Sequence, residues 1–472
     1  MIIKTHKDEI APYLIDASNF SAGCADMVVI PNSINELVEF MLDNNNLISV
    51  AGAGTGVSAG RIPSCGAIVS VEKFDSIEKL ENGKIKLGAG VRLSDLNKAL
   101  EGTEWFYPPN PTENQAFIGG TIATNASGPR SYKFGTTREY VLELELVLGD
   151  GRLVKIKRGR SIDSPLICSD GSSINFPTVE YVSPPFKNAA GYFIQPGMDW
   201  VDLFTGSDGT LAIITGVILD LRPRPKRFFS AILFFLKEEM CWKMVGSIKS
   251  MKSRRIDPCS LEYFDAKCLF RLKNKYPNIP KNAKSALCIE QDISNENDFE
   301  PVLETWYDFL EGQDVLMEDS WFANTPRDMK IFREFRHAVP LIVNEENFRL
   351  GRVKMGTDFA IKDGKLFEMM NFYKDVLSET KIDYVVFGHV GDNHLHINLL
   401  PDKEEIGRAK EVYNRLVNQI LNWDGTVSAE HGIGKLKKKW FHQMTGEKSL
   451  EEMRSIKRTL DPGGKLGIGN LF

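Results

Sequence analysis

Four short segments rich in Gly, Thr and Ser constrain the fold of the first half of the chain. They are residues 51–60 (AGAGTGVSAG), 118–128 (IGGTIATNASG), 134–137 (FGTT) and 206–215 (GSDGTLAIIT). Glycine allows the backbone to approach a phosphate closely, and neighbouring amides and hydroxyls can bind its oxygens. One such loop is usually only a turn, but four in one chain favour a long anionic cofactor held between them.

The first of these loops departs from two common nucleotide motifs. Its glycines stand at positions 52, 54 and 56, and Val57 occupies the place where the dinucleotide fingerprint GxGxxG requires glycine. No GK[ST] sequence follows, so the loop is not a P-loop either. Nicotinamide binding on a Rossmann unit and hydrolysis of a nucleoside triphosphate therefore lose support.

Six of the seven histidines fall in the last third of the chain, and four of them crowd into two short segments. These segments are residues 388–398 (GHVGDNHLHIN) and 429–434 (AEHGIG). His394, His396 and Asn398 alternate, so an extended strand projects all three from one face. Residues 391–393 are of the types that form turns, and a turn there would carry His389 back toward the strand.

These histidines have two interpretations. If Glu430 approaches His389 and His396, two imidazoles and a carboxylate converge, which is the ligand set of a catalytic divalent metal with open positions for substrate. The alternative is a group of hydrogen-bonded core histidines beside a glycine-rich loop. The clustering favours the metal site.

Composition describes an ordinary globular protein. The 472 residues suffice for two or three domains, and a net charge of -5 gives no basic bias toward nucleic acid. Seven cysteines without a CxxC pair argue against a disulfide framework, a zinc ribbon or an iron–sulfur cluster. The N-terminal residues lack the apolar core of a secretory signal, and residues 228–236 are too short an apolar stretch to span a membrane. We expect a cytoplasmic protein.

Local patterns predict mixed secondary structure in both halves. Ser33 and Glu36 form a plausible capping box that opens a helix over residues 34–42. Proline and charge density rises from about Arg222, which indicates a linker into a second α+β domain. Strands are expected at residues 47–50, 67–71, 230–236 and 286–290, and further helices at 300–310 and 365–377.

The order of these motifs resembles the FAD-binding oxidoreductases of the vanillyl-alcohol oxidase superfamily and, within it, the D-2-hydroxyacid dehydrogenases, which act on D-lactate, glycolate or D-2-hydroxyglutarate. The resemblance covers nearly the whole chain, including VVIPNSINELVEF, AGAGTGVSAG, the PPNPTENQAFIGG segment, FTGSDGTLAIIT, GHVGDNHLHIN and SAEHGIG. It implies an α+β protein with a two-subdomain PCMH-type FAD-binding domain in residues 1–221. A mixed α+β substrate cap would follow in residues 222–420, and a C-terminal helical return in residues 421–472 would close the active site.

The resemblance also assigns individual residues. Contacts to noncovalent FAD match Gly52, Gly54, Thr55, Gly56, Gly119, Gly120, Ala123, Asn125, Gly128, Gly135, Gly209 and Ile214. The ligands of a divalent metal, with zinc the expected ion, match His389, His396 and Glu430. Asn398 matches a substrate-contacting residue, His431 the catalytic base, and Arg336 and Lys354 the clamp on the substrate carboxylate. Covalent flavin through histidine is not expected, because His6 is the only histidine before residue 337.

Some positions depart from the family pattern. Ala51 and Ala53 replace an arginine and a glycine of the pyrophosphate loop, and residues 467–470 (GIGN) replace NPGK at the C-terminus. His394 stands where the family pattern GDGN ends in asparagine, which adds a histidine that could bind the metal or alter substrate choice. Arg336 lies in the charged run RDMKIFREFRH and has the alternative of a solvated helix face.

The implied reaction is oxidation of a small D-2-hydroxyacid by hydride transfer to flavin N5, assisted by the metal and the histidine base. Alternatives are a metal-independent FAD alcohol oxidase and the FAD subunit of a larger complex. The electron acceptor could be a quinone, a cytochrome or an electron-transfer flavoprotein, and a homodimer is possible. Basic residues at 222–227 and 249–255 could dock a membrane or the acceptor, although solvated surface charge is the simpler interpretation.

Overall fold

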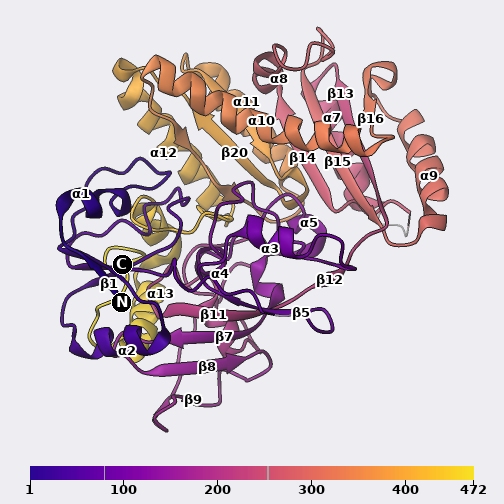
Figure 1. The fold of residues 1–472 in the computed structure, drawn as a ribbon. Helices are drawn as coiled ribbons and strands as arrows, with labels where there is room; N and C mark the ends of the chain where they lie inside the picture. The colour runs from indigo at the N-terminus through magenta and orange to yellow at the C-terminus, as the bar shows by residue number, and fades with distance from the viewer. Residues whose placement is uncertain (79, 252–254) are drawn as a thin grey trace.

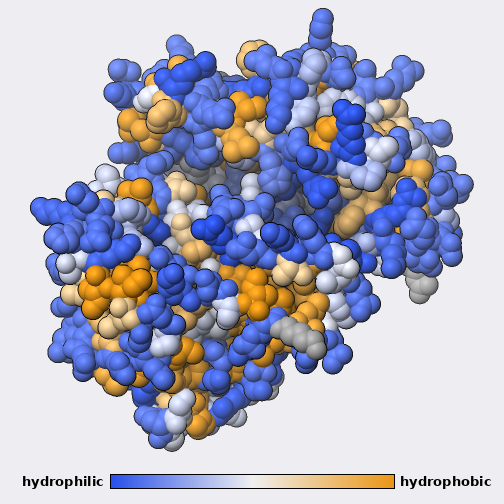
Figure 2. Space-filling model, in the orientation of Figure 1, coloured by the Kyte–Doolittle hydropathy of each residue, from blue (hydrophilic) through white to orange (hydrophobic). Residues whose placement is uncertain are grey.

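The computed structural model describes residues 1–78, 80–251 and 255–472. The protein is α+β and has two lobes, each built on its own sheets, and the C-terminal segment returns to the first lobe (Figure 1). On the face shown in Figure 2 the surface is mostly hydrophilic and is hollowed between the two lobes. This arrangement agrees with the expected fold class.

The first sheet of the N-terminal lobe has the order β1-β2-β4-β3, in which β2, β3 and β4 are parallel. Its strands are β1 (Ile2–Lys4), β2 (Met27–Ile30), β3 (Ile48–Ala51) and β4 (Ala67–Ser70), and α1 (Lys7–Ile10) and η1 (Ala11–Tyr13) pack against buried side chains of β2, β3 and β4. Helix α2 (Ile34–Asp43) connects β2 to β3, and the Ser33 side chain accepts a hydrogen bond from the Glu36 amide. The predicted helix start is confirmed, as are the strands expected at residues 47–50 and 67–71.

The second sheet of this lobe is antiparallel, with the order β5-β11-β7-β8. Its strands are β5 (Lys84–Gly88), β7 (Val141–Val147), β8 (Leu153–Lys157) and β11 (Ile213–Asp220). The connecting helices are α3 (Leu93–Ala99), α4 (Ile118–Ala123), α5 (Ser131–Phe134), η2 (Thr137–Tyr140) and α6 (Trp200–Phe204). Two short antiparallel ladders lie outside this sheet: β6 (Trp105–Phe106) pairs with β12 (Arg222–Pro223), and β9 (Leu166–Ile167) pairs with β10 (Ser173–Ile174). The first glycine-rich segment thus follows β3, and the second contains α4 and the residues after it. The third joins α5 to η2, and the fourth leads into β11.

The second lobe is an antiparallel sheet of eight strands covered by helices on both faces. Its path runs β16 (Trp321–Phe322), β13 (Arg227–Phe235), β15 (Ser285–Ile293), β14 (Ser260–Asp265), β19 (Tyr384–Gly388), β20 (His394–Leu399) and β17 (Met355–Gly356), and β18 (Phe359–Ala360) also pairs with β20. The strands expected at residues 230–236 and 286–290 are confirmed by β13 and β15.

Alternation along β13 explains the two helical layers, because successive side chains of a strand point to opposite faces. Ile232 and Phe234 pack in one cluster with α8 (Ala266–Leu272) and α10 (Pro326–Leu350). Leu233 and Phe235 belong to the large cluster that includes α7 (Glu238–Ser250), α9 (Phe299–Glu311) and α11 (Leu366–Glu379). Helices α9 and α11 confirm the two helices predicted for this lobe, and short turns of 3-10 helix, η3 (Glu296–Asp298), η4 (Met317–Asp319), η5 (Val390–Asp392) and η6 (Lys403–Glu405), complete it.

The C-terminal segment joins the two lobes. After α12 (Ile406–Asn422) the chain passes through the AEHGIG segment into α13 (Lys438–Leu460), where Gly446 interrupts the helix with a φ of 75°. Leu466 then bridges to Ile48 of β3, so the tail packs on the N-terminal lobe. Among the described residues, no helix is both long and apolar enough to cross a bilayer.

The two basic stretches make internal contacts. Arg224 donates hydrogen bonds to backbone carbonyls at residues 100, 103 and 105. Lys249 contacts Asp363 and the carbonyl of Gly391, while residues 252–254 of the same stretch lie outside the described residues. These contacts favour a structural role for Arg224 and Lys249, and docking to a membrane or an electron acceptor stays a prediction.

Candidate active site and metal centre

A tight turn carries His389 back over strand β20. Helix η5 follows β19 directly, and Asn393 takes a left-handed conformation with a φ of 50°, which asparagine tolerates better than most residues. The imidazole centroids of His389 and His396 are 5.6 Å apart as a result. The turn at residues 391–393 and the strand through His394, His396 and Asn398 are both confirmed.

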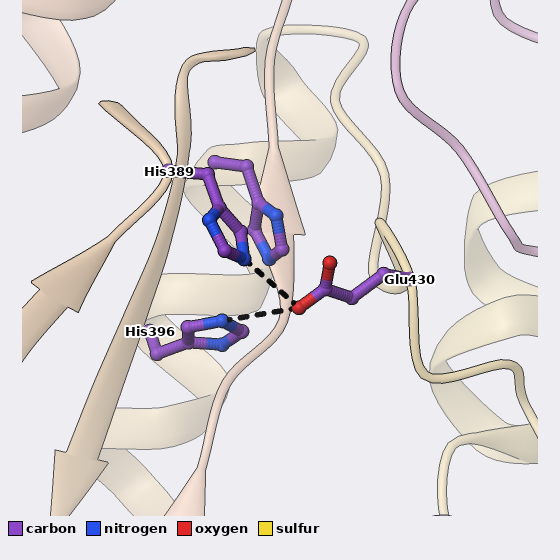
Figure 3. Close-up of side chains that lie close together, drawn as sticks. His389, His396 and Glu430 are labelled. Atoms are coloured by element: carbon purple, nitrogen blue, oxygen red, sulfur yellow. Dashed lines mark hydrogen bonds and ion pairs between the residues drawn. The ribbon is translucent and has the colours of Figure 1, made fainter. Parts of the chain in front are cut away.

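Glu430 reaches these histidines from the C-terminal segment. Its Oε1 lies 3.2 Å from Nε2 of His389 and 3.4 Å from Nε2 of His396 (Figure 3). Ligand atoms of these three residues and of His394 all lie within 4.8 Å of one another. The structure thus brings together the three residues expected to hold a metal, from two distant parts of the chain.

In both His389 and His396, the ring nitrogen that faces away from Glu430 contacts an oxygen atom of the protein. His389 Nδ1 lies 2.5 Å from Oε1 of Glu262, and His396 Nδ1 lies 3.2 Å from the carbonyl oxygen of Thr357. Metal-binding histidines usually donate their second N–H to a carboxylate or carbonyl in this way, which fixes the ring and its tautomer. The donor set and its supports therefore fit a divalent ion.

Glu430 is charged in this setting. Lys187 Nζ lies 3.0 Å from Oε2 of Glu430 with only 4% of its side chain exposed, and the Ser127 hydroxyl donates to the same oxygen at 2.9 Å. Burial would raise the pKa of Glu430, but Lys187 and His389 hold it well below its ordinary value. Burial would likewise raise the pKa of Glu262, which His389 and Arg336 lower to about 2.

His431 lies beside the cluster and is oriented by Asp358. Its backbone N–H donates to Oδ2 of Asp358 at 2.9 Å, its Nδ1 lies 3.4 Å from the same oxygen, and its ring stacks on His396 at 5.3 Å. Asp358 is fully buried and also receives a hydrogen bond from Lys437 at 2.6 Å. Burial lowers the pKa of His431 to about 4 against the opposing effect of Asp358, so the imidazole is neutral and can accept a proton.

The two residues expected to bind the substrate carboxylate differ in their surroundings. Arg336 Nε lies 3.2 Å from Oε2 of Glu262, so its guanidinium adjoins the histidine cluster and is not a solvated helix face. Lys354 Nζ donates to Asn344 at 2.8 Å and, within the described residues, contacts none of the metal-ligand candidates. Asn398 is buried on the strand face of His396, with its side chain against Gly356.

The first glycine-rich loop fits an anionic ligand. The backbone N–H groups of Gly54, Thr55 and Gly56 donate to no acceptor among the described residues. A side chain added at Gly56 or at Gly120 would meet no protein atom within 4 Å, so both positions border open space. Unpartnered amides beside open backbone are what a phosphate-binding loop requires.

The remaining positions expected to contact FAD lie on neighbouring segments. Gly119, Gly120 and Ala123 belong to α4, Asn125 and Gly128 follow it, Gly135 ends α5, and Gly209 and Ile214 lie before and within β11. Asn125 has a φ of 49° and accepts a hydrogen bond from the Arg138 amide, which adds a structural role to its expected one.

The C-terminal segment ties these loops to the histidine cluster. The amides of Ile433 and Gly434 donate to Oδ2 of Asp208, next to Gly209 in sequence. The Ser58 hydroxyl donates to the carbonyl of His431 at 3.2 Å. The backbone of His431, next to Glu430 in sequence, thus contacts the first glycine-rich loop. At the very end of the chain, Asn470 donates to the carbonyls of Gly60 and Asp208.

Sequence reasoning missed Glu262, Asp358 and Lys187. Glu262 carries a signal, because it is an acid within the otherwise apolar run SLEYF of strand β14. Asp358 and Lys187 have no local signal, since each acquires its side-chain partners from residues at least 36 positions away.

Comparisons with known proteins identify the family of the chain. Residues 226–471, more than half of the chain, match the family described as FAD linked oxidases, C-terminal domain, and residues 25–157 match the family described as FAD binding domain. Glycolate oxidase subunit GlcD of Bacillus subtilis is 26% identical over 98% of this chain and 92% of its own length. D-lactate dehydrogenase of Archaeoglobus fulgidus is 26% identical over 94% and 91%, and D-2-hydroxyglutarate dehydrogenase of Stutzerimonas stutzeri is 22% identical over 100% and 96%.

The fold also has a solved counterpart. A structure of alkyldihydroxyacetonephosphate synthase superimposes with a TM-score of 0.69 over 98% of this chain and 81% of that chain, at 13% sequence identity. That likeness concerns the fold alone. The two family matches, by themselves, identify an FAD-binding domain within the N-terminal lobe and place residues 226–471 in the C-terminal domain of FAD-linked oxidases. The chain therefore belongs to the FAD-linked oxidases, an FAD-dependent oxidoreductase family related to glycolate oxidase subunits and to D-lactate and D-2-hydroxyglutarate dehydrogenases.

Proposed function

We propose that this protein oxidises a D-2-hydroxyacid to the 2-oxoacid, with noncovalent FAD as the hydride acceptor. The observation that carries the proposal is the convergence of two imidazole nitrogens and a carboxylate beside His431, a neutral histidine whose backbone contacts the first glycine-rich loop. The names of the relatives supply the substrate class, since they act on glycolate, D-lactate or D-2-hydroxyglutarate.

His389, His396 and Glu430 would hold a divalent ion, for which zinc is the expected identity. Such an ion, when bound, lowers the pKa of a coordinated substrate hydroxyl. Lys187 and Ser127 hold Glu430 in place, and Glu262 holds His389, so the protein keeps these donors oriented before substrate arrives.

His431 would take the proton of the 2-hydroxyl at a ring nitrogen, with Asp358 orienting the ring and balancing the charge it acquires. The carbon–oxygen single bond becomes a carbonyl as the Cα hydrogen leaves with its electron pair, for which the flavin supplies the acceptor. The proton and the hydride thus have separate destinations. His431 is suited to its part because its ring stacks on His396 of the ligand cluster and its backbone carbonyl contacts the first glycine-rich loop.

Arg336 is the better supported of the two carboxylate-binding residues. Its Nε faces Glu262 and its Nη1 faces His337, whereas Nη2 has only a long 3.4 Å contact with Thr112. That outer edge can donate to a substrate carboxylate beside the metal ligands. Lys354 and Asn398 would complete the pocket.

Product analysis tests this reaction. We expect purified protein with an artificial electron acceptor to form the 2-oxoacid from at least one of D-lactate, glycolate and D-2-hydroxyglutarate, and to leave the L-isomers of the chiral acids unchanged. His431→Asn should abolish turnover while retaining FAD. Turnover that persists in full after metal removal would overturn the metal's role and indicate a metal-independent alcohol oxidase. Absence of any 2-oxoacid would overturn the reaction itself.

The name of one relative favours a second candidate function for this chain. The Bacillus subtilis protein is named as a subunit of glycolate oxidase, and it aligns with 98% of this chain. This chain could accordingly be the FAD-carrying subunit of an assembly that passes electrons to a quinone, a cytochrome or an electron-transfer flavoprotein. Turnover by the isolated chain with an artificial acceptor would exclude a strict requirement for other subunits in the oxidation step.

A further inference from the structure

A fourth histidine, His394, lies inside the cluster and has no hydrogen bond to explain it. Its side chain is completely buried, and neither ring nitrogen makes an aligned hydrogen bond within the described residues. Its ring centroid lies 5.0 Å from that of His389 and 4.5 Å from that of His396. A buried polar ring without a hydrogen-bond partner is costly, so its nitrogens are expected to serve a ligand.

The surroundings of His394 repeat those of the other two histidines. Glu262 supports His389 and the Thr357 carbonyl supports His396, each from the side away from Glu430. His394 has a carboxylate beside it as well, because its Nε2 lies 2.9 Å from Oδ1 of Asp358. That contact is short but is not aligned as a hydrogen bond. A supporting carboxylate behind a ring is the arrangement usual for metal-binding histidines.

We propose that His394 is a fourth protein ligand of the metal, so that the site contains three imidazoles and one carboxylate. The inference rests on the proposed metal site and extends it with a residue to which the family resemblance assigns no role. A ring nitrogen of His394 lies within 4.8 Å of the ligand atoms of His389, His396 and Glu430, close enough for one ion to contact all four after small side-chain movements.

Four protein ligands change what the ion can do. A tetrahedral ion would have every position filled and none left for a substrate hydroxyl. An ion that also takes the substrate hydroxyl would then need at least five positions, to which zinc can expand and which manganese and iron adopt more readily. Asp358 would then contact two histidines of the site: Oδ1 lies beside the ring of the ligand His394, and Oδ2 orients the ring of His431.

The competing interpretation is a core histidine paired only with Asp358. Both interpretations predict that replacing His394 reduces stability, so activity and melting temperature do not separate them. The number of imidazoles bound to the ion does separate them. The test therefore uses the full chain with FAD bound, cleared of metal by a chelator and reloaded with cobalt(II).

X-ray absorption at the cobalt edge counts imidazole ligands, and titration with cobalt(II) measures affinity. We expect three imidazoles in the wild type and two in His394→Asn, with a coordination number above four in the wild type. Affinity should fall at least about tenfold in His394→Asn and in the non-ligating His394→Leu. His6→Asn, which alters an exposed histidine far from the cluster in sequence, serves as the matched control and should behave as the wild type.

Two outcomes would overturn the inference in distinguishable ways. Two imidazoles in both the wild type and His394→Asn, with equal affinity, would make His394 a core histidine while the metal site itself stands. A wild-type protein that binds no cobalt and turns over unchanged after chelation would remove the proposed metal site and, with it, the role of His394. Retention of FAD by the His394 variants shows that a loss of cobalt does not come from unfolding.

Discussion

Arg130 of the N-terminal lobe and Glu290 of the second lobe form a two-point ion pair that is nearly buried. Arg130 Nε lies 2.7 Å from Oε2 of Glu290, Nη2 lies 3.0 Å from Oε1, and the two side chains are 14% and 16% exposed. Arg130 stands between Gly128 and Gly135, two of the expected flavin contacts. The pair therefore fixes the lobe that carries the histidines against the segment expected to hold FAD.

Removing one partner of this pair should destabilise the protein strongly. Arg130→Met leaves the Glu290 carboxylate buried without its counter-charge, and the free energy of unfolding should fall by about 3–5 kcal/mol. Chemical denaturation followed by flavin and tryptophan signals measures this. The double variant Arg130→Met/Glu290→Met should recover part of the loss. Glu78→Gln, which breaks the exposed pair with Lys86, is the control and should cost no more than about 1 kcal/mol. Equal losses in Arg130→Met and Glu78→Gln would contradict the assigned role.

Glu430→Gln should separate metal binding from flavin binding. The amide keeps the size of the carboxylate but removes the charge that faces His389 and His396, and it leaves Lys187 with Asp392 as its remaining acid at 3.7 Å. We expect a metal content well below that of the wild type, with FAD retained and turnover lost. Elemental analysis and the visible flavin spectrum report the two properties independently. Glu447→Gln, on the exposed face of α13, is the control. A variant with full metal content would exclude Glu430 as a ligand.

Gly120→Ala should weaken FAD binding while stabilising the protein without FAD. An added Cβ meets no protein atom within 4 Å, and alanine in helix α4 should contribute about 0.5–1 kcal/mol to the stability of the FAD-free form. If the cofactor passes over this backbone, the methyl group takes space that it needs, and FAD affinity should fall about tenfold or more. Gly407→Ala, at an exposed open position in α12, should raise stability without changing affinity. Unchanged FAD affinity in Gly120→Ala would place the cofactor elsewhere.

The parts of this structure that were predictable depend on contacts close in sequence. The capped start of α2 and the turn that returns His389 to His396 are both set by side chains within seven residues of one another. Glu430 is a candidate from the sequence because it lies in the second histidine-bearing segment, and the family resemblance then assigns it to the metal. The resemblance gave no role to Asp358, because the contacts of Asp358 with His394 and His431 exist only after strands β18 and β20 pair and the C-terminal segment returns.

The surroundings of Arg336 also depend on residues distant in sequence. Its charged neighbours in sequence allow either a solvated helix face or a buried contact, and packing of α10 over the sheet decides between them. Glu262, the acid that receives its guanidinium, lies 74 positions earlier in the chain. Lys354 has no such contact with the cluster, so its expected role still depends on the resemblance.

Asp265 predicts a pH dependence of stability away from the active site. Burial raises the pKa of Asp265 to about 7, although the amides of Cys268 and Val386 donate to the carboxylate and oppose this. The folded protein then retains a proton that the unfolded chain releases near pH 4, so this contribution to stability falls as pH rises from about 4 to about 7. Asp265→Asn should show a smaller decline in the free energy of unfolding over that range. Asp75→Asn, at an exposed carboxylate, should follow the wild type, and an identical decline in Asp265→Asn would contradict the prediction.

The most direct test of the proposed reaction is the absorbance of the bound flavin under anaerobic conditions. We predict that D-lactate, glycolate or D-2-hydroxyglutarate bleaches the oxidised flavin, that the L-isomers of the chiral acids do not, and that prior metal removal with a chelator slows the bleaching strongly. Restoring a divalent ion should restore the rate. A flavin that none of these acids reduces, with or without added metal, would contradict the assignment of this FAD-linked oxidase to 2-hydroxyacid oxidation.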